Sequence, residues 1–427
     1  MKLGIKTYLL ISLILAAVIG TLLGRVEEST SAIQSFPATV CPGNLTDGTT
    51  TDILPNAKVL GASIPNSKNK LKTLGSTNLL TKKPLLVDGG KVTSISISRG
   101  SNGSLATVNC SISDGNDWFV GGSSSVSSKG TLSLVNSGLS AAQVDLVIYS
   151  SKAASILSKT VPANSSADIP LDTLAPGEDA IAVNVITRSG RVSPFMIDNR
   201  KQGLRSVGSD YVATSSAPSK LVVIPNIPRI AAKKGGKQII RVVVPGNQSA
   251  TLRATIYSSD GSFAPIGLDG ANVSSASVRD INFNPIVADS SFSLRLESDV
   301  PISAAVLSNN SGDFLWSTPS DPINNTVLQI GGFAPLIRAY GEKINLTLNL
   351  IDISGNRSSV TLIGSDTLAF RPKKPLLRIE FNAKEKNNFA SLIINNGSGI
   401  AQLPVVSGAR LERSELPRSD ARTINRG

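Results

Sequence analysis

Two compact acidic clusters are the groups in this sequence that could carry out hydrolysis. "SDGND" contains Asp114 and Asp117, and "PGED" contains Glu178 and Asp179. Paired carboxylates can act as general acid and as base or nucleophile in the hydrolysis of glycosides. Asp, Asn and Gly also form the tight connections between strands. We interpret both clusters as turns and keep a carboxylate-dependent glycoside hydrolase as a remote alternative.

A second possible catalytic pair is Ser67 and Lys70 in "SKNK", with the spacing of a Ser-x-x-Lys dyad. The stretch is polar, no helical pattern follows it, and neither partner motif of the serine acyl-enzymes is present. The chain contains no histidine, which excludes histidine-dependent triads and most zinc and copper sites. We therefore expect a protein that is not an enzyme.

The two cysteines, Cys41 and Cys110, are too few to form a thiolate metal site. In an exported chain an even number of cysteines indicates a disulfide. Closing a loop of roughly 70 residues would stabilise the fold by about 4 kcal/mol in the chain-entropy model. No stretch has the ligand spacing of a calcium loop. The sequence predicts one disulfide and no cofactor.

The N-terminus has the pattern of an export signal. Lys2 and Lys6 precede an uncharged run from Thr7 to Gly24, which ends at Arg25. The run is slightly short for a membrane span of about 20 residues, and no clear small-x-small cleavage site precedes Arg25. We expect a helical anchor that leaves the rest of the chain outside the cytoplasm. A cleaved signal and a secreted protein are the alternative.

The chain is basic, with a formal net charge of +12. Few aromatic residues lie among the basic ones, so we do not expect nucleic acid as a partner. We interpret the densest basic run as solvated loop charge, and the alternative is contact with an anionic envelope polymer or lipid head groups. The run consists of Arg200, Lys201, Arg205, Lys220, Arg229, Lys233, Lys234, Lys237 and Arg241.

A repeat of about 107 residues organises the chain, and its alternating apolar residues indicate strands. "AQVDLVIYSS" (142–151), "ATLRATIYSSDG" (250–261) and "SSVTLIGSD" (358–366) align with one another. On this register one face should be buried and the other should point away. The buried positions are Leu146, Ala254 and Val360, and their outward neighbours are Asp145, Arg253 and Thr361.

Each copy also ends in a pair of strands: 180–197, 291–308 and 390–407. In the middle copy Phe292, Leu294 and Leu296 share one face. On the other face, which we expect to meet water, lie Ser291, Ser293, Arg295 and Glu297.

A strand leads into each copy, and the first of these is "DWFVGG" (117–122). Val120 corresponds to Ile224 and Ile330 in the later copies. We interpret Gly121 and Gly122 as a strand exit that needs unusual backbone angles, replaced in the second copy by Pro-Asn. A ligand platform built on Trp118 and Phe119 is the alternative.

Low aromatic content and abundant Gly, Ser, Thr, Val and Asn favour an all-β fold. With six or seven strands per copy, an immunoglobulin-like sandwich fits better than a propeller blade. We expect three tandem sandwiches after an N-terminal hydrophobic helix. The predicted segments are a signal or anchor (1–25), a stalk and variable region clamped to the first sandwich by the disulfide (26–116), three sandwich repeats (117–209, 210–316, 317–409) and a disordered polar tail (410–427).

The motifs "TVCPG" (39–43), "VNCSI" (108–112), "WFVGG" (118–122) and "TLSLVNSG" (131–138) resemble an actinobacterial family of secreted proteins classed as a domain of unknown function. In that family the second cysteine precedes a W-[FY]-x-G-G stretch and an L-x-L-x-N-P-G strand, in which Ser137 here replaces the proline. Trp118, Phe119, Gly121 and Gly122 are the residues that match its motif. The resemblance covers residues 40 to 200 and implies a location in the envelope, without an activity.

These observations predict a non-catalytic, extracytoplasmic envelope protein that serves as a β-sandwich scaffold or interaction module. Its partner would be another envelope protein or an anionic or polysaccharide cell-wall polymer, with the membrane contacted through the N-terminal helix. The alternative is a carbohydrate or cell-wall polymer binding module, which an exposed strip of aromatic residues would favour.

Overall fold

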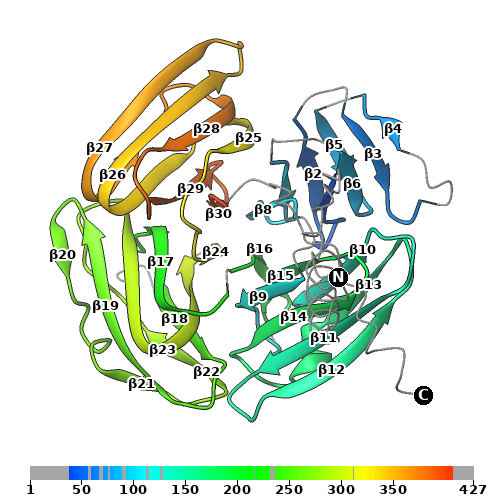
Figure 1. The fold of residues 1–427 in the computed structure, drawn as a ribbon, viewed down its shortest axis with the longest axis horizontal. Helices are drawn as coiled ribbons and strands as arrows, with labels where there is room; N and C mark the ends of the chain where they lie inside the picture. Colours follow the sequence, from blue (N-terminus) through cyan, green and yellow to red (C-terminus); the bar gives the residue numbers. More distant parts are fainter. Residues whose placement is uncertain are drawn as a thin grey trace, which may run out of the picture. The chain divides into compact units, whose positions relative to one another are not determined.

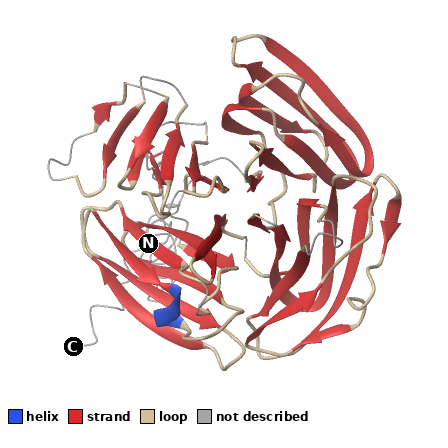
Figure 2. Cartoon of the chain, turned by 180° about the vertical axis from the view of Figure 1, so that it is seen from behind, coloured by secondary structure: helices blue, strands red, loops and turns tan. Residues whose placement is uncertain are grey.

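The computed structural model describes residues 38–406, except 56–58, 67–70, 76, 89–92, 112–114, 126–127, 216, 231–235 and 311. This part of the chain folds into β-strands with one short α-helix, α2 (Leu171–Leu174), drawn in blue in Figure 2. The all-β prediction is therefore confirmed. None of the described helical residues forms a segment long and apolar enough to cross a membrane. The expected anchor, stalk and tail, and the Ser67–Lys70 pair, lie outside the described residues.

Residues 38–111 form two four-stranded sheets, which we call the N-terminal module. Their strand orders are β1-β6-β3-β4 and β5-β2-β7-β8. The strands are β1 (Ala38–Cys41), β2 (Thr49–Ile53), β3 (Leu60–Ser63), β4 (Lys72–Thr73), β5 (Asn78–Thr81), β6 (Leu85–Asp88), β7 (Ile95–Arg99) and β8 (Leu105–Asn109).

The first repeat also has two four-stranded sheets, ordered β12-β11-β14-β9 and β13-β10-β15-β16. Apolar side chains of both sheets share one core, so the two layers form a sandwich. The strands are β9 (Asn116–Val120), β10 (Thr131–Asn136), β11 (Ala142–Tyr149), β12 (Ser155–Val161), β13 (Ser165–Pro170), β14 (Ala182–Ser189), β15 (Val192–Gln202) and β16 (Arg205–Val212).

In the second repeat the expected pair of strands at 291–308 is wrong: one long strand, β23 (Ser291–Asn310), runs through both layers. Its first half pairs with β17 and β19, and its second half pairs with β18 and β24. The other strands are β17 (Ser219–Pro228), β18 (Lys237–Val244), β19 (Ala250–Ser258), β20 (Gly261–Phe263), β21 (Ala271–Val273), β22 (Ser277–Asn282) and β24 (Asp313–Ser317).

The third repeat is built on a long hairpin of β26 (Leu336–Asp352) and β27 (Arg357–Phe370), visible in orange in Figure 1. Its sheet has the order β25-β28-β26-β29-β30, and β27 pairs with β26 alone. The remaining strands are β25 (Thr326–Phe333), β28 (Leu376–Ala383), β29 (Phe389–Asn395) and β30 (Ile400–Pro404).

One sheet order recurs four times along the chain. Four sets of neighbouring hydrogen-bonded strands have the same order, position by position: β5-β2-β7-β8, β13-β10-β15-β16, β22-β18-β23-β24 and β28-β26-β29-β30. The N-terminal module therefore repeats part of the pattern that the sequence revealed only in the three later copies. In each case the last strand is the second strand of a hairpin.

These four last strands contact one another in a closed cycle. β8 contacts β16, β16 contacts β24, β24 contacts β30, and β30 contacts β8 (Figure 1). Asp313 of β24 binds both the neighbouring strand β30 and the strand β8, which is not its neighbour in the cycle. Its Oδ2 accepts hydrogen bonds from the backbone N–H of Leu105 in β8 (3.3 Å) and of Ile400, the first residue of β30 (2.9 Å). We call these four strands the inner strands.

The expected alternation of the repeats is present in β11 and β19. Leu146 and Ala254 are buried, whereas Asp145 is half-buried and Arg253 is exposed. In β27 the difference is smaller: Val360 is half-buried and Thr361 exposed.

We expected one face of β23 to meet water. This expectation is wrong for the first residues of the strand. Ser291 and Ser293 are as fully buried as Leu294. Ser291 Oγ accepts a hydrogen bond from Arg338 Nε (3.0 Å), and Ser293 Oγ lies 3.2 Å from Thr367 Oγ1. Because Arg338 and Thr367 belong to β26 and β27, the third repeat covers this face.

Candidate functional site

The aromatic residues of the "DWFVGG" stretch lie in the core. Trp118 is 4% exposed and Phe119 is 1% exposed. The ring of Trp118 stacks on that of Tyr149, with 5.8 Å between the centroids. Since neither ring is open to solvent, the stretch does not provide the ligand platform considered as the alternative.

The two glycines form the strand exit that the sequence predicted. Gly122 has a φ of +80°, which side chains rarely allow. Gly121 permits a close approach instead: a Cβ there would lie 2.7 Å from Val212 Cγ1 and 3.1 Å from Trp316 Cδ2. Val212 is in β16 and Trp316 is in β24. The exit of β9 is therefore packed against two inner strands, one of them from the second repeat.

Arg241 of β18 binds this exit from the second repeat. Its side chain is 1% exposed, and Nη1 donates to the carbonyl oxygens of Gly122 and of Ile181 (3.2 Å). Nη2 donates to the carbonyl oxygen of Asp179 (2.8 Å). Asp280 accepts from Nε (2.7 Å) and from Nη2 (2.9 Å). Every donor group of the guanidinium thus binds an oxygen, as a buried cation requires.

This position corrects the interpretation of the basic run as solvated charge. Lys201, Arg205, Lys220 and Lys237 are exposed, as expected, and Lys233 and Lys234 lie outside the described residues. Arg241 differs because its guanidinium is enclosed between two repeats. No local pattern separates Arg241 from its exposed neighbours, since the groups that bury it are up to 119 residues away in the sequence.

Trp316 completes the contact between the first and second repeats. Its ring lies 4.9 Å from the Arg241 guanidinium carbon, a favourable cation–π geometry. Its Nε1 donates to Asp198 Oδ2 (3.0 Å), and its backbone N–H donates to Asp210 Oδ2 (2.6 Å). We call the group of Gly121, Gly122, Arg241 and Trp316 the first joint.

The equivalent exit in the second repeat, Pro225-Asn226, binds the third repeat. Asn226 has a φ of +62° and is fully buried. Its Nδ2 donates to the carbonyl oxygens of Leu336 (2.7 Å) and Ser391 (3.0 Å). The carbonyl oxygen of Pro225 accepts from Ser391 Oγ (2.6 Å) and from Gln402 Nε2 (3.1 Å). These contacts form the second joint.

The glycine exit of β25 in the third repeat contacts the N-terminal module. A Cβ on Gly331 would lie 3.0 Å from Ile53 Cδ1 of β2. Thr93 forms a parallel bridge with Leu328, and Gln329 Nε2 donates to the carbonyl oxygen of Pro55 (3.0 Å). This third joint closes the cycle of modules.

The predicted disulfide between Cys41 and Cys110 is confirmed. It connects β1 to the end of β8, so both of its ends lie in the N-terminal module. It does not clamp this region to the first sandwich as we expected. A cluster of apolar residues makes that contact instead, and it contains Val40, Ile64, Ala106, Val108, Val135, Phe195, Ile197 and Tyr211.

The described members of the acidic clusters serve structural contacts. Asp114 lies outside the described residues, and Asp117 is buried. Glu178 accepts hydrogen bonds from Ser151 Oγ (2.6 Å) and pairs with Lys152 (2.9 Å). The Ser151 hydrogen bond lowers the pKa of Glu178, which opposes a role as general acid. Glu178 stabilises the turn, and the carbonyl oxygen of Asp179 accepts a hydrogen bond from Arg241 of the first joint.

Other carboxyl groups, which the sequence analysis missed, are buried near the inner strands. Burial raises the pKa of Asp52 to about 7 and that of Asp313 to about 6. Burial also raises the pKa of Asp210 well above its usual range. Their signal in the sequence is an aspartate flanked by apolar or small residues within a strand, as in "SDYV". Perturbed carboxyls can indicate catalysis, but these are enclosed by strands and bind backbone or hydroxyl groups.

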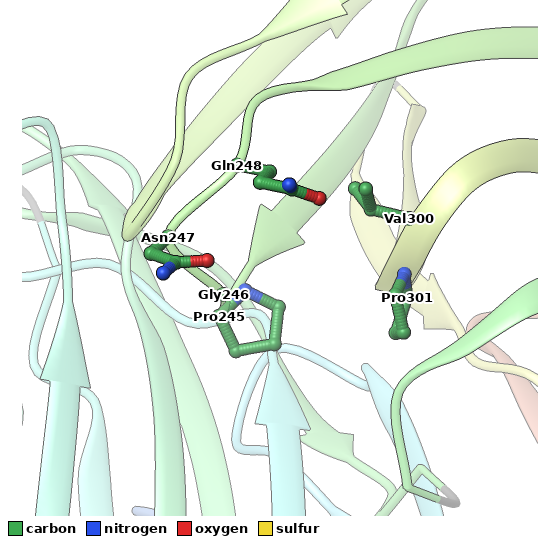
Figure 3. A pocket seen from close by; sticks show the side chains of 6 residues that line it. All are labelled: Pro245, Gly246, Asn247, Gln248, Val300 and Pro301. Carbon is green, nitrogen blue, oxygen red and sulfur yellow. The ribbon is translucent and has the colours of Figure 1, made fainter.

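The described surface has hollows that no sequence-predicted site residue lines. Figure 3 shows one that is lined by Pro245, Gly246, Asn247, Gln248, Val300 and Pro301. None of these side chains titrates. Within the described ranges no three His, Cys, Asp or Glu side chains gather as a metal site would require.

The fold and its joints define an all-β protein whose distinctive polar residues hold successive sheet modules together. The chain belongs to a family of unknown function, DUF5719, whose model matches residues 87–333. This range contains the first joint, the Pro225-Asn226 side of the second joint, and Cys110.

No curated protein matches the chain. Among solved structures, the crystal structure of a tetra-tandem repeat in the extending region of a large adhesion protein is 12% identical. The match covers 86% of this chain and 97% of that one, with a TM-score of 0.11. At that score the similarity carries no argument about fold or function.

Proposed function

We propose that this chain is a non-catalytic, extracytoplasmic envelope protein that acts as a scaffold or interaction module. The proposal rests on one observation: the motif glycines and several buried polar residues hold neighbouring modules together at the joints. Gly121, Gly122 and Arg241 fix one module against the next. Such an architecture holds surfaces in fixed relation to one another, as a scaffold must.

The proposed location outside the cytoplasm rests on two features. The N-terminal sequence has the charge and apolar pattern of an export signal or anchor. The only two cysteines form a disulfide, which persists in oxidising compartments. We propose that the N-terminal segment is retained as a membrane anchor, with secretion after cleavage as the alternative.

We also propose that the three repeats at 117–209, 210–316 and 317–409 are immunoglobulin-like. Support comes from the first repeat, where two antiparallel four-stranded sheets enclose one core. The second repeat departs from this pattern, because β23 joins both layers.

The alternative, a module that binds carbohydrate or cell-wall polymer, has weaker support. Such sites commonly use exposed aromatic rings, but among the described aromatic side chains only Phe263 is exposed, at 36%. Exposed basic residues, among them Lys201, Arg205 and Lys220, would instead serve an anionic polymer through charge.

Photo-cross-linking in the native envelope distinguishes these functions. A photoreactive residue replaces Leu139 or Ile266, which are 79% and 102% exposed, in the full-length protein. Discrete adducts that contain a second protein are expected for a scaffold. Retention on protein-free cell wall without protein adducts would establish the polymer-binding alternative, and release of new reducing ends from envelope glycans would refute the non-catalytic assignment.

A further inference from the structure

A buried carboxyl group lies close to the disulfide of the N-terminal module. Asp52 of β2 is fully buried, and Cys110 is 4% exposed. Ser96 of β7 lies between them: its hydroxyl donates to Asp52 Oδ1 (2.5 Å), and its Oγ is 3.7 Å from Cys110 Sγ. The second oxygen of Asp52 accepts from Thr81 Oγ1 (2.6 Å). One hydroxyl group therefore connects the carboxyl group to a sulfur atom of the disulfide.

Asp52 lacks the partners that hold other buried carboxyl groups of this protein. Asp313 accepts from backbone N–H groups of β8 and β30, and Asp198 pairs with Arg200 (2.8 Å). Among the described residues Asp52 has no ion pair, and its oxygens accept from two hydroxyl groups. A carboxyl group buried without a cation is costly, and an apolar residue would fill the same space at lower cost. A chemical role would account for its presence beside the disulfide.

The surroundings of Asp52 suit proton exchange with a thiol. Burial raises the pKa of Asp52 to about 7, and a free cysteine thiol has a pKa of about 8.5. Transfer of a proton from the thiol to the carboxylate is therefore only mildly unfavourable. Tyr211 of β16 also faces Asp52, and burial raises the pKa of Tyr211, so its hydroxyl stays neutral. The opposite sheet contributes Cys41 and apolar side chains, among them Leu85 and Val87.

The carboxyl, the hydroxyl and one of the two sulfurs belong to a single sheet. Asp52 and Ser96 lie in β2 and β7 of the sheet β5-β2-β7-β8, and Cys110 directly follows β8. Cys41 lies in β1 of the other sheet. In the described part of the chain, Ser96 is the polar side chain that contacts this disulfide, and it does so at Cys110. The base can therefore assemble beside Cys110 before the two sheets close on each other.

We propose that Asp52, acting through Ser96, removes the proton from the Cys110 thiol when the disulfide forms. A disulfide oxidant of low molecular weight, RSSR, first forms a mixed disulfide with the Cys41 thiolate and releases one RS⁻. The Cys110 proton then passes to Ser96 Oγ, while the Ser96 proton passes to Asp52. The Cys110 thiolate attacks Cys41 Sγ, the bond from Cys41 to SR breaks, and the second RS⁻ leaves and takes a proton from water.

The electrons balance in this sequence, because the two cysteines are oxidised to one disulfide and RSSR is reduced to two thiols. Ser96 contacts the reacting sulfur, and Asp52 acts through it as the proton acceptor. The inference does not depend on the scaffold role proposed above, since it concerns only how the disulfide forms.

The pH dependence of disulfide closure tests this inference in the full-length protein. The reduced protein is diluted from denaturant into oxidised glutathione, at a concentration above which the closure rate no longer rises. Samples are quenched with acid, and labelling of the remaining thiols separates chains with a mixed disulfide from closed chains. The variants are Asp52→Asn and Ser96→Ala. Thr81→Val is the matched control, because Thr81 donates to the other oxygen of Asp52.

The wild-type closure rate should rise only to about pH 7, where Asp52 is ionised, and then level off. Without this base the rate should rise until the thiol itself ionises, at about pH 8.5. At about pH 7, Asp52→Asn and Ser96→Ala should close at least about tenfold more slowly than the wild type and Thr81→Val. By about pH 9.5 these rates should agree within about twofold.

A structural role of Asp52 would slow closure by the same factor at every pH. That result for Asp52→Asn would overturn the proposal. A wild-type profile for Ser96→Ala, or an equal loss at neutral pH in Thr81→Val, would do the same.

Discussion

The guanidinium of Arg241 lies 4.9 Å from the ring of Trp316 and donates a hydrogen bond to the carbonyl oxygen of Gly122. One side chain thus connects the exit of β9 in the first repeat to an inner strand of the second. Because Arg241 is 1% exposed, its charge has no access to water and depends entirely on these partners.

Arg241→Ala should therefore destabilise the protein strongly. It leaves Asp280 and three backbone carbonyl oxygens without their donor, and breaking a buried pair typically costs about 3–5 kcal/mol. Lys237→Ala, at an exposed position of the same strand, is the control and should cost less than about 0.5 kcal/mol. Denaturant unfolding measures both variants. Equal stability of the two would mean that the first joint does not hold the repeats together.

Gly121→Ala tests the close approach of the inner strands. The new Cβ would lie 2.7 Å from Val212 Cγ1, and overpacking of this kind costs about 1–3 kcal/mol. Gly246→Ala is the matched control, since a Cβ there meets nothing within 4 Å. Thermal unfolding should show a lower melting temperature for Gly121→Ala only. A normal melting temperature for that variant would show that β16 and β24 can move apart at no cost.

Ser293→Leu tests the unexpected burial of β23. The wild-type hydroxyl lies against Thr367 of the third repeat, so a larger side chain must displace β27 and should cost about 1–3 kcal/mol. Ser262→Leu, at an exposed position of β20, should change the free energy of unfolding by less than about 0.5 kcal/mol. If Ser293→Leu were equally neutral, the second face of β23 would be open to solvent after all.

Asp52 should make the protein more stable in mild acid than in mild base. Burial raises its folded-state pKa to about 7 from an ordinary value of 3.8. Between these values the folded chain holds a proton that the unfolded chain has released, so the free energy of unfolding falls as pH rises through about 7. Asp313 and Asp210, whose pKa values are also raised by burial, act in the same direction.

Asp52→Asn should remove the Asp52 share of this dependence. The amide stays neutral, and the hydroxyls of Thr81 and Ser96, which now donate to the carboxyl (2.6 and 2.5 Å), can rotate to accept from it. Near pH 4 the free energy of unfolding of the variant should equal that of the wild type. Above pH 8 it should be larger by at most about 4 kcal/mol. Urea unfolding across this range is the measurement, and parallel pH profiles of the two proteins would contradict it.

Local patterns were sufficient to predict the β class, the alternation in β11 and β19, the glycine exit and the disulfide, but not that the strand pair expected at 291–308 is one strand. Alternation in β11 and β19 and an even cysteine count depend on neighbours in the chain, which the sequence displays directly. The same reasoning failed for Ser293 and Arg241, because the groups that bury them belong to other modules. Periodicity identifies the two faces of a strand, but it does not reveal whether another module covers the second.

The N-terminal module escaped detection as a copy for a related reason. Its strands are short: β2 has five residues, against eight in β18 and seventeen in β26. Only the pairing order β5-β2-β7-β8 relates it to the other sheets, and pairing order is not visible in an unaligned sequence. The buried Asp52 was missed with it, because the strand that contains it, β2, was not recognised as a strand.

The closed cycle of inner strands has a consequence for synthesis. The N-terminal module emerges first, yet the side chains of Thr107 and Asn109 in β8 donate to the carbonyl oxygens of Gln402 (3.3 Å) and Pro404 (3.0 Å) in β30. Those acceptors are made almost three hundred residues later. A chain that emerges from its N-terminus must keep the inner side of this module unsatisfied, and open to chaperones or proteases, until β30 has left the ribosome.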